Sequence, residues 1–157
     1  MHLHHYIVTF LLGIACCTVN AAENEFITIQ CKSNFTETMV HLQEALLEYG
    51  YHPLRVQQVD TGLINHGYKS DKYRILFFSK DSEIETLKNT YPMLIPFLPH
   101  KITIYTENNQ TVVNTIRPKA LGELFSEPEI RKIISHWDDD MRIIMKEVGN
   151  CLGVDTS

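Results

Sequence analysis

Positive charge is scarce in this sequence: 14 lysines and arginines stand against 19 aspartates and glutamates, a net charge of −5 over 157 residues. Without a basic excess the chain cannot neutralise a phosphate backbone, so we expect no nucleic-acid partner. Internal repeats of solenoid length are also lacking. With 44% hydrophobic residues, the composition is that of an ordinary globular protein, and the length predicts one domain.

Several motifs that carry chemistry are missing as well. The four cysteines form no C-x-x-C pair and no C-x-x-C-H motif, so neither a zinc ribbon nor covalently attached haem is encoded. No serine lies in G-x-S-x-G, and no glycine-rich phosphate loop occurs. The sequence therefore names no reaction, and any function has to be sought in individual polar residues.

The first 21 residues contain no Asp, Glu, Lys or Arg. Their apolar run, Tyr6–Cys17, is shorter than the about 20 residues that span a bilayer and matches the core of a signal peptide; Val19-Asn20-Ala21 offers a cleavage site. We therefore predict a signal peptide over 1–21 and one mature domain over 22–157. That domain would be periplasmic or secreted and would meet a membrane only through the transient signal peptide. Lipidation at Cys16 and a buried N-terminal helix are the alternatives.

Export leaves two cysteines in the mature chain, Cys31 and Cys151. In an oxidising compartment they form a candidate disulfide that joins the first strand to the C-terminal tail. Two unpaired thiols are an equally open alternative, because the sequence does not show whether the two Cα atoms approach within about 7 Å.

Hydrophobic periodicity predicts a mixed α and β chain, in which alternation indicates strands and steps of three and four indicate helices. Asn34 and Glu37 form a capping box at the first helix. The predicted strands are 25–32, 54–59, 73–78, 102–106 and 111–116; the predicted helices are 35–49, 82–91, 119–125 and 128–148; the segments 60–68 and 92–99 are predicted loops. This order predicts an α+β two-layer sandwich, with a roughly five-stranded sheet and helices packed on one face.

Two loops hold the candidate ligand-binding residues. One precedes the most apolar strand and gathers charged and aromatic groups around two glycines; the other is rich in proline. Because binding groups concentrate on loops that a rigid scaffold holds, we expect a pocket between these loops. The candidate residues are Asp60, His66, Tyr73, Arg74, His100 and Lys101. The alternative is structural: Arg74 needs a partner, Asp60 or Asp71, and that ion pair would fix a turn.

Histidine and aspartate supply the candidate metal ligands. None of the five mature histidines has the spacing of a paired helical or finger motif, so a metal site would have to assemble in space, with His66 and His100 as candidates. Asp138-Asp139-Asp140 is not such a site, because successive helical residues point about 100° apart. We expect Asp138 and Asp139 to face solvent. Asp140 lies next to the apolar stripe of the same helix, so a bond to a group at the sheet edge is an alternative for it.

The segment Pro92–Pro99 places three prolines among five large apolar side chains. Proline removes backbone donors, so an extended loop is expected, and its apolar side chains need cover. Either the loop folds back over its own sheet, or it meets its copy across a two-fold axis. A homodimer through this loop is the preferred hypothesis.

Several segments resemble the DUF302 family, and the similarity runs from about Phe26 to Val148. They include the family's opening, its central strand, its proline-bearing loop with the following strand, and its late helix. The residues that carry the resemblance are Ser33–Thr38 before a helix that ends at Gly50, Lys72–Phe78, Pro96–Tyr105 and Pro118–Phe125.

The resemblance implies a compact two-layer α/β domain that is often a homodimer and is frequently exported in bacteria. It implies no established activity. Some relatives carry one cysteine after the central strand and another in the later loop, whereas this chain has Ser79 and His100 at those places. Thiol chemistry suggested for such relatives therefore does not transfer, and no catalytic residue is carried over.

The preferred hypothesis for function is an exported binding or accessory domain for a small molecule, without catalysis of its own. The first alternative is a metal- or haem-binding protein that uses His100 with His66 or Met93. The second is an enzyme that acts on a small periplasmic molecule through Asp60, His66 or His100. The sequence leaves the cofactor unknown.

Overall fold

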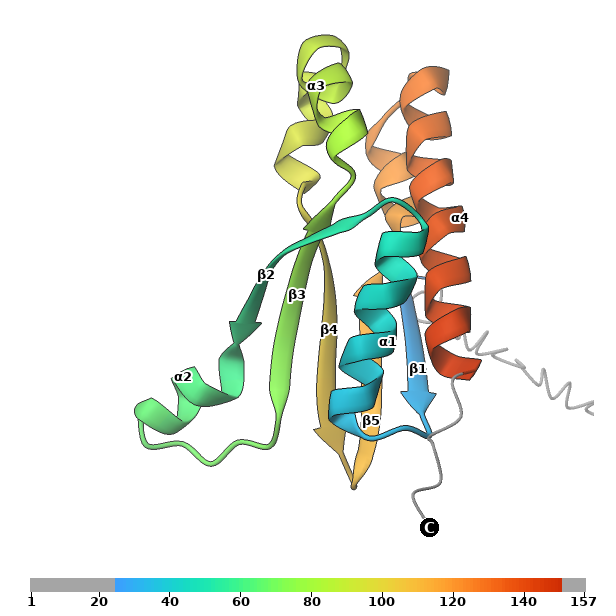
Figure 1. The fold of residues 1–157 in the computed structure, drawn as a ribbon. Helices are drawn as coiled ribbons and strands as arrows, with labels where there is room; N and C mark the ends of the chain where they lie inside the picture. Colours follow the sequence, from blue (N-terminus) through green and yellow to red (C-terminus); the bar gives the residue numbers. More distant parts are fainter. Residues whose placement is uncertain (1–24, 151–157) are drawn as a thin grey trace, which may run out of the picture.

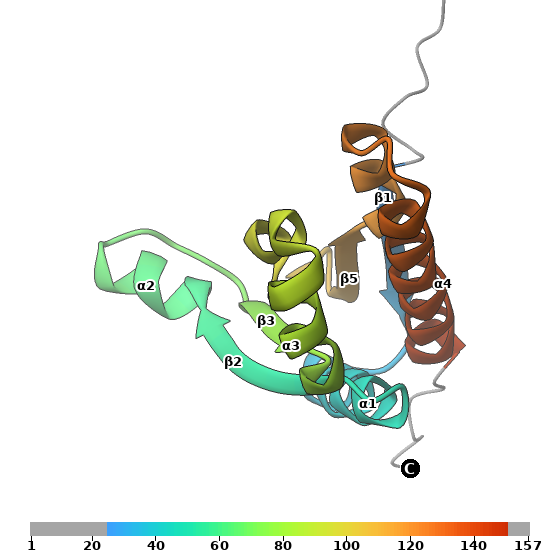
Figure 2. The ribbon, with the colours of Figure 1, turned by 90° about the horizontal axis from the view of Figure 1, so that it is seen from above.

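The computed structural model describes residues 25–150, so the predicted signal peptide and Cys151 lie outside the described residues. A five-stranded antiparallel sheet in the order β1-β5-β4-β3-β2 forms one layer. Helices α1 and α4 pack on one face of it (Figure 1). Figure 2 shows both helices on the same side, while β2 curves away and carries α2 outward. The α+β two-layer fold predicted from the sequence is confirmed.

The elements alternate along the chain much as the periodicity indicates. The strands are β1 (Phe26–Cys31), β2 (His52–Gln58), β3 (Tyr73–Ser79), β4 (His100–Glu107) and β5 (Gln110–Ile116). The helices are α1 (Phe35–Glu48), α2 (Val59–Asn65), α3 (Asp81–Thr90) and α4 (Pro128–Asn150), with 3-10 helices η2 (Pro92–Phe97) and η3 (Pro118–Leu124). None of the helices within residues 25–150 is long and apolar enough to cross a membrane.

Two segments expected to be loops are helical. The stretch after β2 begins with the short helix α2, whose Asp60 is bonded to Arg74 on β3. The proline-rich segment forms η2 instead of an extended loop. Pro92 stands at the start of η2, where its missing N–H would have had no helical partner, so the proline starts the turn without cost.

The start of α1 follows its sequence signal closely. The Asn34 side chain accepts hydrogen bonds from the backbone N–H groups of Thr36 (2.9 Å) and Glu37 (3.1 Å). The Glu37 carboxylate accepts one in return from the backbone N–H of Asn34 (3.4 Å). The predicted capping box is therefore confirmed. At the other end Gly50 has φ 77°, a left-handed conformation that glycine adopts without strain.

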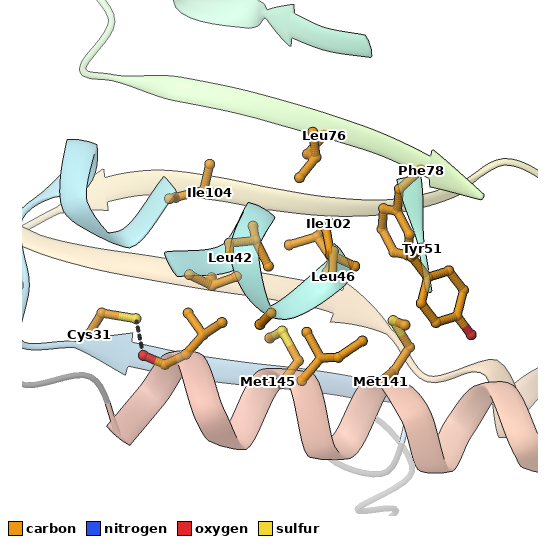
Figure 3. Packing of buried hydrophobic residues seen from close by; sticks show 14 residues of the cluster. Cys31, Leu42, Leu46, Tyr51, Leu76, Phe78, Ile102, Ile104, Met141 and Met145 are labelled. Carbon is orange, nitrogen blue, oxygen red and sulfur yellow. Dashed lines mark hydrogen bonds between the residues drawn. The ribbon is translucent and has the colours of Figure 1, made fainter. Parts of the chain in front are cut away.

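The main core lies between the sheet and the pair α1 and α4 (Figure 3). The side chains that fill it are fully or almost fully buried and come from all three parts: Leu42, Leu46, Leu76, Ile102, Ile104, Met141 and Met145. At one end of this core the Sγ of Cys31 lies 3.9 Å from the backbone oxygen of Val148. The core thus ties the edge strand β1 to the last turns of α4.

A second apolar cluster lies where α3, η2 and α4 meet, and Trp137 is at its centre with 0% exposure. Leu94 of η2 is also fully buried there, and Phe97 packs edge-to-face on Phe125 at 5.9 Å between ring centroids. Of the large apolar side chains of η2, Met93 is the one left exposed (47%). The proline-rich segment therefore folds back on its own chain. The homodimer stays a prediction, but the apolar side chains of this segment no longer support it, because all but Met93 already pack within one chain.

Candidate functional site

The two groups of candidate residues lie at opposite ends of the sheet. β3 and β4 pair so that Tyr73 is opposite Tyr105 and Phe78 is opposite His100. Phe78 lies five residues along the strand from Tyr73, which corresponds to about 17 Å. The single pocket expected between the two loops is therefore not formed, because one loop enters β3 at its start and the other enters β4 beside the end of β3 (Figure 1).

The first loop is held by an ion pair. Asp60 is 7% exposed, and its carboxylate accepts a hydrogen bond from the Arg74 guanidinium, which holds the pKa of Asp60 below its usual range. Arg74 also donates to the backbone oxygen of Tyr73 at 3.1 Å. The pair fixes α2 against β3. Of the two partners predicted for Arg74, Asp60 and Asp71, the structure shows Asp60.

The remaining residues of this end also serve local structure. The Nδ1 of His66 lies 2.8 Å from the backbone oxygen of Gly62, at the exposed C-terminus of α2. Tyr73 contacts Tyr105 across the two strands, with ring centroids 5.9 Å apart. Because His66 belongs to the Asp60 end and His100 to the other, the two candidate metal ligands are not brought together. Within residues 25–150, no three His, Cys, Asp or Glu side chains gather closely enough to hold a metal ion.

His100 begins β4 among aromatic rings. Its ring meets Trp137 edge-to-face at 4.8 Å between centroids, and lies 5.7 Å from Phe78 and 6.0 Å from Tyr51. Burial lowers the pKa of His100 to about 4. The imidazole is therefore neutral near pH 7, and it presents one N–H donor and one nitrogen acceptor.

A charged cluster lies next to these rings. The Asp140 carboxylate accepts hydrogen bonds from the Tyr51 hydroxyl and from the Lys80 Nζ, each at 2.9 Å, and Lys80 also lies 4.5 Å from the centroid of the Tyr51 ring. Burial, with the Asp140 charge, raises the pKa of Tyr51, so its hydroxyl stays protonated and donates. For Asp140, the alternative of a bond at the sheet edge is the one that the structure shows. Nothing in the sequence pattern indicated that Tyr51 and Lys80 would be its partners.

The expectation that Asp138 faces solvent is wrong. Asp138 is 4% exposed, and its carboxylate accepts hydrogen bonds from the Arg117 side chain (3.2 and 2.7 Å) and the Lys119 backbone (3.2 Å). Burial by itself would raise the pKa of Asp138, but these hydrogen bonds outweigh burial and lower it. The residue is buried because η3 packs over this part of α4, which the periodicity of α4 alone does not reveal.

A cavity of about 350 Å³ adjoins His100, between the segment 96–101, the end of β5, η3 and α4. Phe97, Leu98, Leu121 and Met141 supply much of its apolar wall. The volume lies within the about 300–1,000 Å³ typical of small-molecule sites. Of the six candidate ligand-binding residues, His100 and its neighbour Lys101 line this cavity, whereas the other four lie elsewhere. The cavity can therefore hold a small, mostly apolar molecule beside His100 and Lys101.

Comparison with known proteins identifies the fold. A family profile described as "Domain of unknown function DUF302" matches residues 27–148. The uncharacterised conserved protein DUF302 from Bacillus stearothermophilus is similar in structure, with a TM-score of 0.72 and 22% sequence identity, over 78% of this chain and 97% of that one. At that identity the likeness shows the fold alone. No curated protein matches the sequence significantly. From the profile match over most of its length, the chain belongs to the DUF302 family.

Proposed function

We propose that the protein is an exported domain that binds a small, mostly apolar molecule in the His100 cavity and has no catalysis of its own. The observation that supports this function is the cavity itself, about 350 Å³ with a mostly apolar wall that also includes the neutral His100 and Lys101. Burying apolar surface would supply the affinity, and the imidazole would select the ligand by one hydrogen bond.

The chemistry of His100 limits the class of ligand. A neutral imidazole donates one hydrogen bond and accepts one, so it fits a hydroxyl or a carbonyl group. The nearby charges of Lys80 and Asp140 are bonded to each other and do not line the cavity, so the proposal gives them no part in binding the ligand. The ligand is therefore a compact alcohol, phenol or ketone with an apolar body.

Thermal-shift and NMR titrations with phenol, cyclohexanol and acetophenone test this function, with toluene as the analogue that lacks the hydrogen-bonding group. Leu121→Trp should fill the cavity and abolish the shifts. Leu124→Trp is the matched control on the same 3-10 helix, because Leu124 is 65% exposed and lies outside the cavity wall. Equal binding by both variants, or tightest binding of toluene, would refute the assignment.

We also propose that the protein is a homodimer, and that exposed apolar side chains of β2 and of the α2 region form the contact. Leu54 is 56% exposed, Ile64 55% and Tyr68 65%, and this part of the chain projects from the domain (Figure 2). Large apolar side chains grouped on a projecting segment are typical of contact surfaces. Sedimentation tests the proposal: Leu54→Glu with Ile64→Glu should give folded monomers, whereas Leu124→Glu should stay dimeric. A wild-type monomer at about tens of micromolar would refute it.

A further inference from the structure

β1 ends the sheet at one side and, among the described strands, pairs with β5 alone. Its sequence, FITIQC, contains neither proline nor charge. Such an edge exposes backbone N–H and C=O groups without the usual protection. The opposite edge strand, β2, contains Pro53 and Arg55, with a register shift between them, and these are the features by which edges avoid pairing. The two edges thus differ, and β1 is the one suited to accept another strand.

A groove of about 520 Å³ follows this unprotected edge. Phe26 and Gln30 line it from one face of β1, and Ile27 and Ile29 line it from the other face, so the groove wraps around the outer edge of the strand. Helix α4 runs beside β1 in the same direction and forms the second wall (Figure 1). A segment bound in the groove would therefore lie along β1 with α4 beside it.

The wall from α4 is cationic. Arg142 and Lys146 line the groove and are exposed, and no carboxylate lines it, although the whole chain carries a net charge of −5. Arg117 at the same groove is neutralised by Asp138. Arg142 has only a 3.9 Å contact with the exposed Asp139, and Lys146 has no ion pair within residues 25–150. Like charges four residues apart weaken a helix slightly, so Arg142 and Lys146 do not stabilise each other.

The spacing of the two cations matches an extended chain. Residues four apart on a helix are about 6 Å apart along its axis, and alternate residues of a strand are about 6.8 Å apart. A strand added to β1 would direct alternate side chains toward α4. Carboxylates at two alternate positions could then reach Arg142 and Lys146 together.

We propose that the β1 edge and this groove are a docking site for an extended acidic segment of a partner protein, which adds to the sheet as a sixth strand. Backbone hydrogen bonds to β1 hold the segment, and Arg142 and Lys146 select alternate glutamates or aspartates. A second copy of this chain fits less well, because pairing β1 with β1 would bring no carboxylate from either strand to these cations. The site is separate from the His100 cavity and does not depend on the proposed function.

The test uses three synthetic peptides of eight residues. The first alternates glutamate with threonine and valine, the second has lysine in place of glutamate, and the third is the first with N-methylated backbone positions that block strand pairing. NMR titration of the protein measures binding, and hydrogen exchange locates it. The glutamate peptide should bind and slow exchange within β1, while β2 stays unchanged; the other two should not bind.

Charge variants separate the proposal from unspecific adhesion. The double variant Arg142→Glu with Lys146→Glu should bind the glutamate peptide about tenfold or more weakly than the wild type, and should bind the lysine peptide more tightly. Lys132→Glu, an exposed charge of α4 outside this groove, is the matched control and should change nothing. The proposal would be overturned if Lys132→Glu lost as much peptide affinity as the double variant, or if the N-methylated peptide bound as tightly as the first peptide. It would also be overturned if hydrogen exchange in β1 slowed with protein concentration in the absence of peptide, which would assign the edge to a second copy of the chain.

Discussion

Mild acid should destabilise the protein through His100. The pKa of His100 is about 4 in the folded protein, against about 6.5 for an unperturbed histidine. Because the pKa is lower in the folded state, the unfolded chain takes up the proton first as the pH falls. The contribution of His100 is therefore complete above about pH 6.5 and is lost as the pH falls to about 4. At about 1.4 kcal/mol per pH unit, the loss over this interval is about 3 kcal/mol.

Urea unfolding at about pH 7 and about pH 4.5 measures this loss. Trp137 is the single tryptophan and lies against His100, so its fluorescence reports unfolding. Between these two pH values, the free energy of unfolding should fall by about 2 to 3 kcal/mol more in the wild type than in His100→Gln, because glutamine cannot take up the proton. His66→Gln, at an exposed position, should behave as the wild type. Asp60 and Asp138 have lowered pKa values, so their contributions are lost only at lower pH.

The direct measurement is an NMR titration of the His100 ring. A midpoint near pH 4 would agree with a neutral imidazole that is largely withdrawn from solvent. A midpoint near 6.5, or an equal loss of stability in the wild type and in His100→Gln, would refute both the burial of this ring and the ligand chemistry derived from it.

Four further outcomes are expected. Trp137→Ala should lower the free energy of unfolding by about 3–5 kcal/mol, measured by circular dichroism in urea, because Trp137 is 0% exposed; wild-type emission typical of water-exposed indole would contradict this. Phe97→Asp should unfold the protein, because Phe97 packs within its own chain; a folded monomer in sedimentation would instead favour the proline-rich segment as the dimer contact. Thiol titration of the exported protein without reductant decides between the two alternatives for Cys31 and Cys151: no titratable thiol would agree with the disulfide, and two would exclude it. N-terminal sequencing of the exported protein should begin within a few residues of Ala22, and an intact N-terminus would exclude cleavage.

The sequence by itself determined most of the elements. The alternation of β1 indicated a strand, Asn34 and Glu37 indicated the start of α1, and the long apolar stripe indicated α4, all confirmed by the structure. These signals are readable because an element with one buried face must repeat apolar side chains at its own period. The helical form of 92–97 was missed, because a short 3-10 helix with prolines leaves no such period.

Only the tertiary structure decided which polar residues meet. Asp140 bonds Tyr51 across 89 positions of sequence and Lys80 across 60, and Arg117 reaches Asp138 because η3 packs on α4. The register that places His100 opposite Phe78 likewise separated it from His66 and put it beside a cavity. Periodicity records which face of an element is buried, but it does not record what covers that face. The partner of each buried polar group depends on strand register and on helix placement, which form only when the chain is packed.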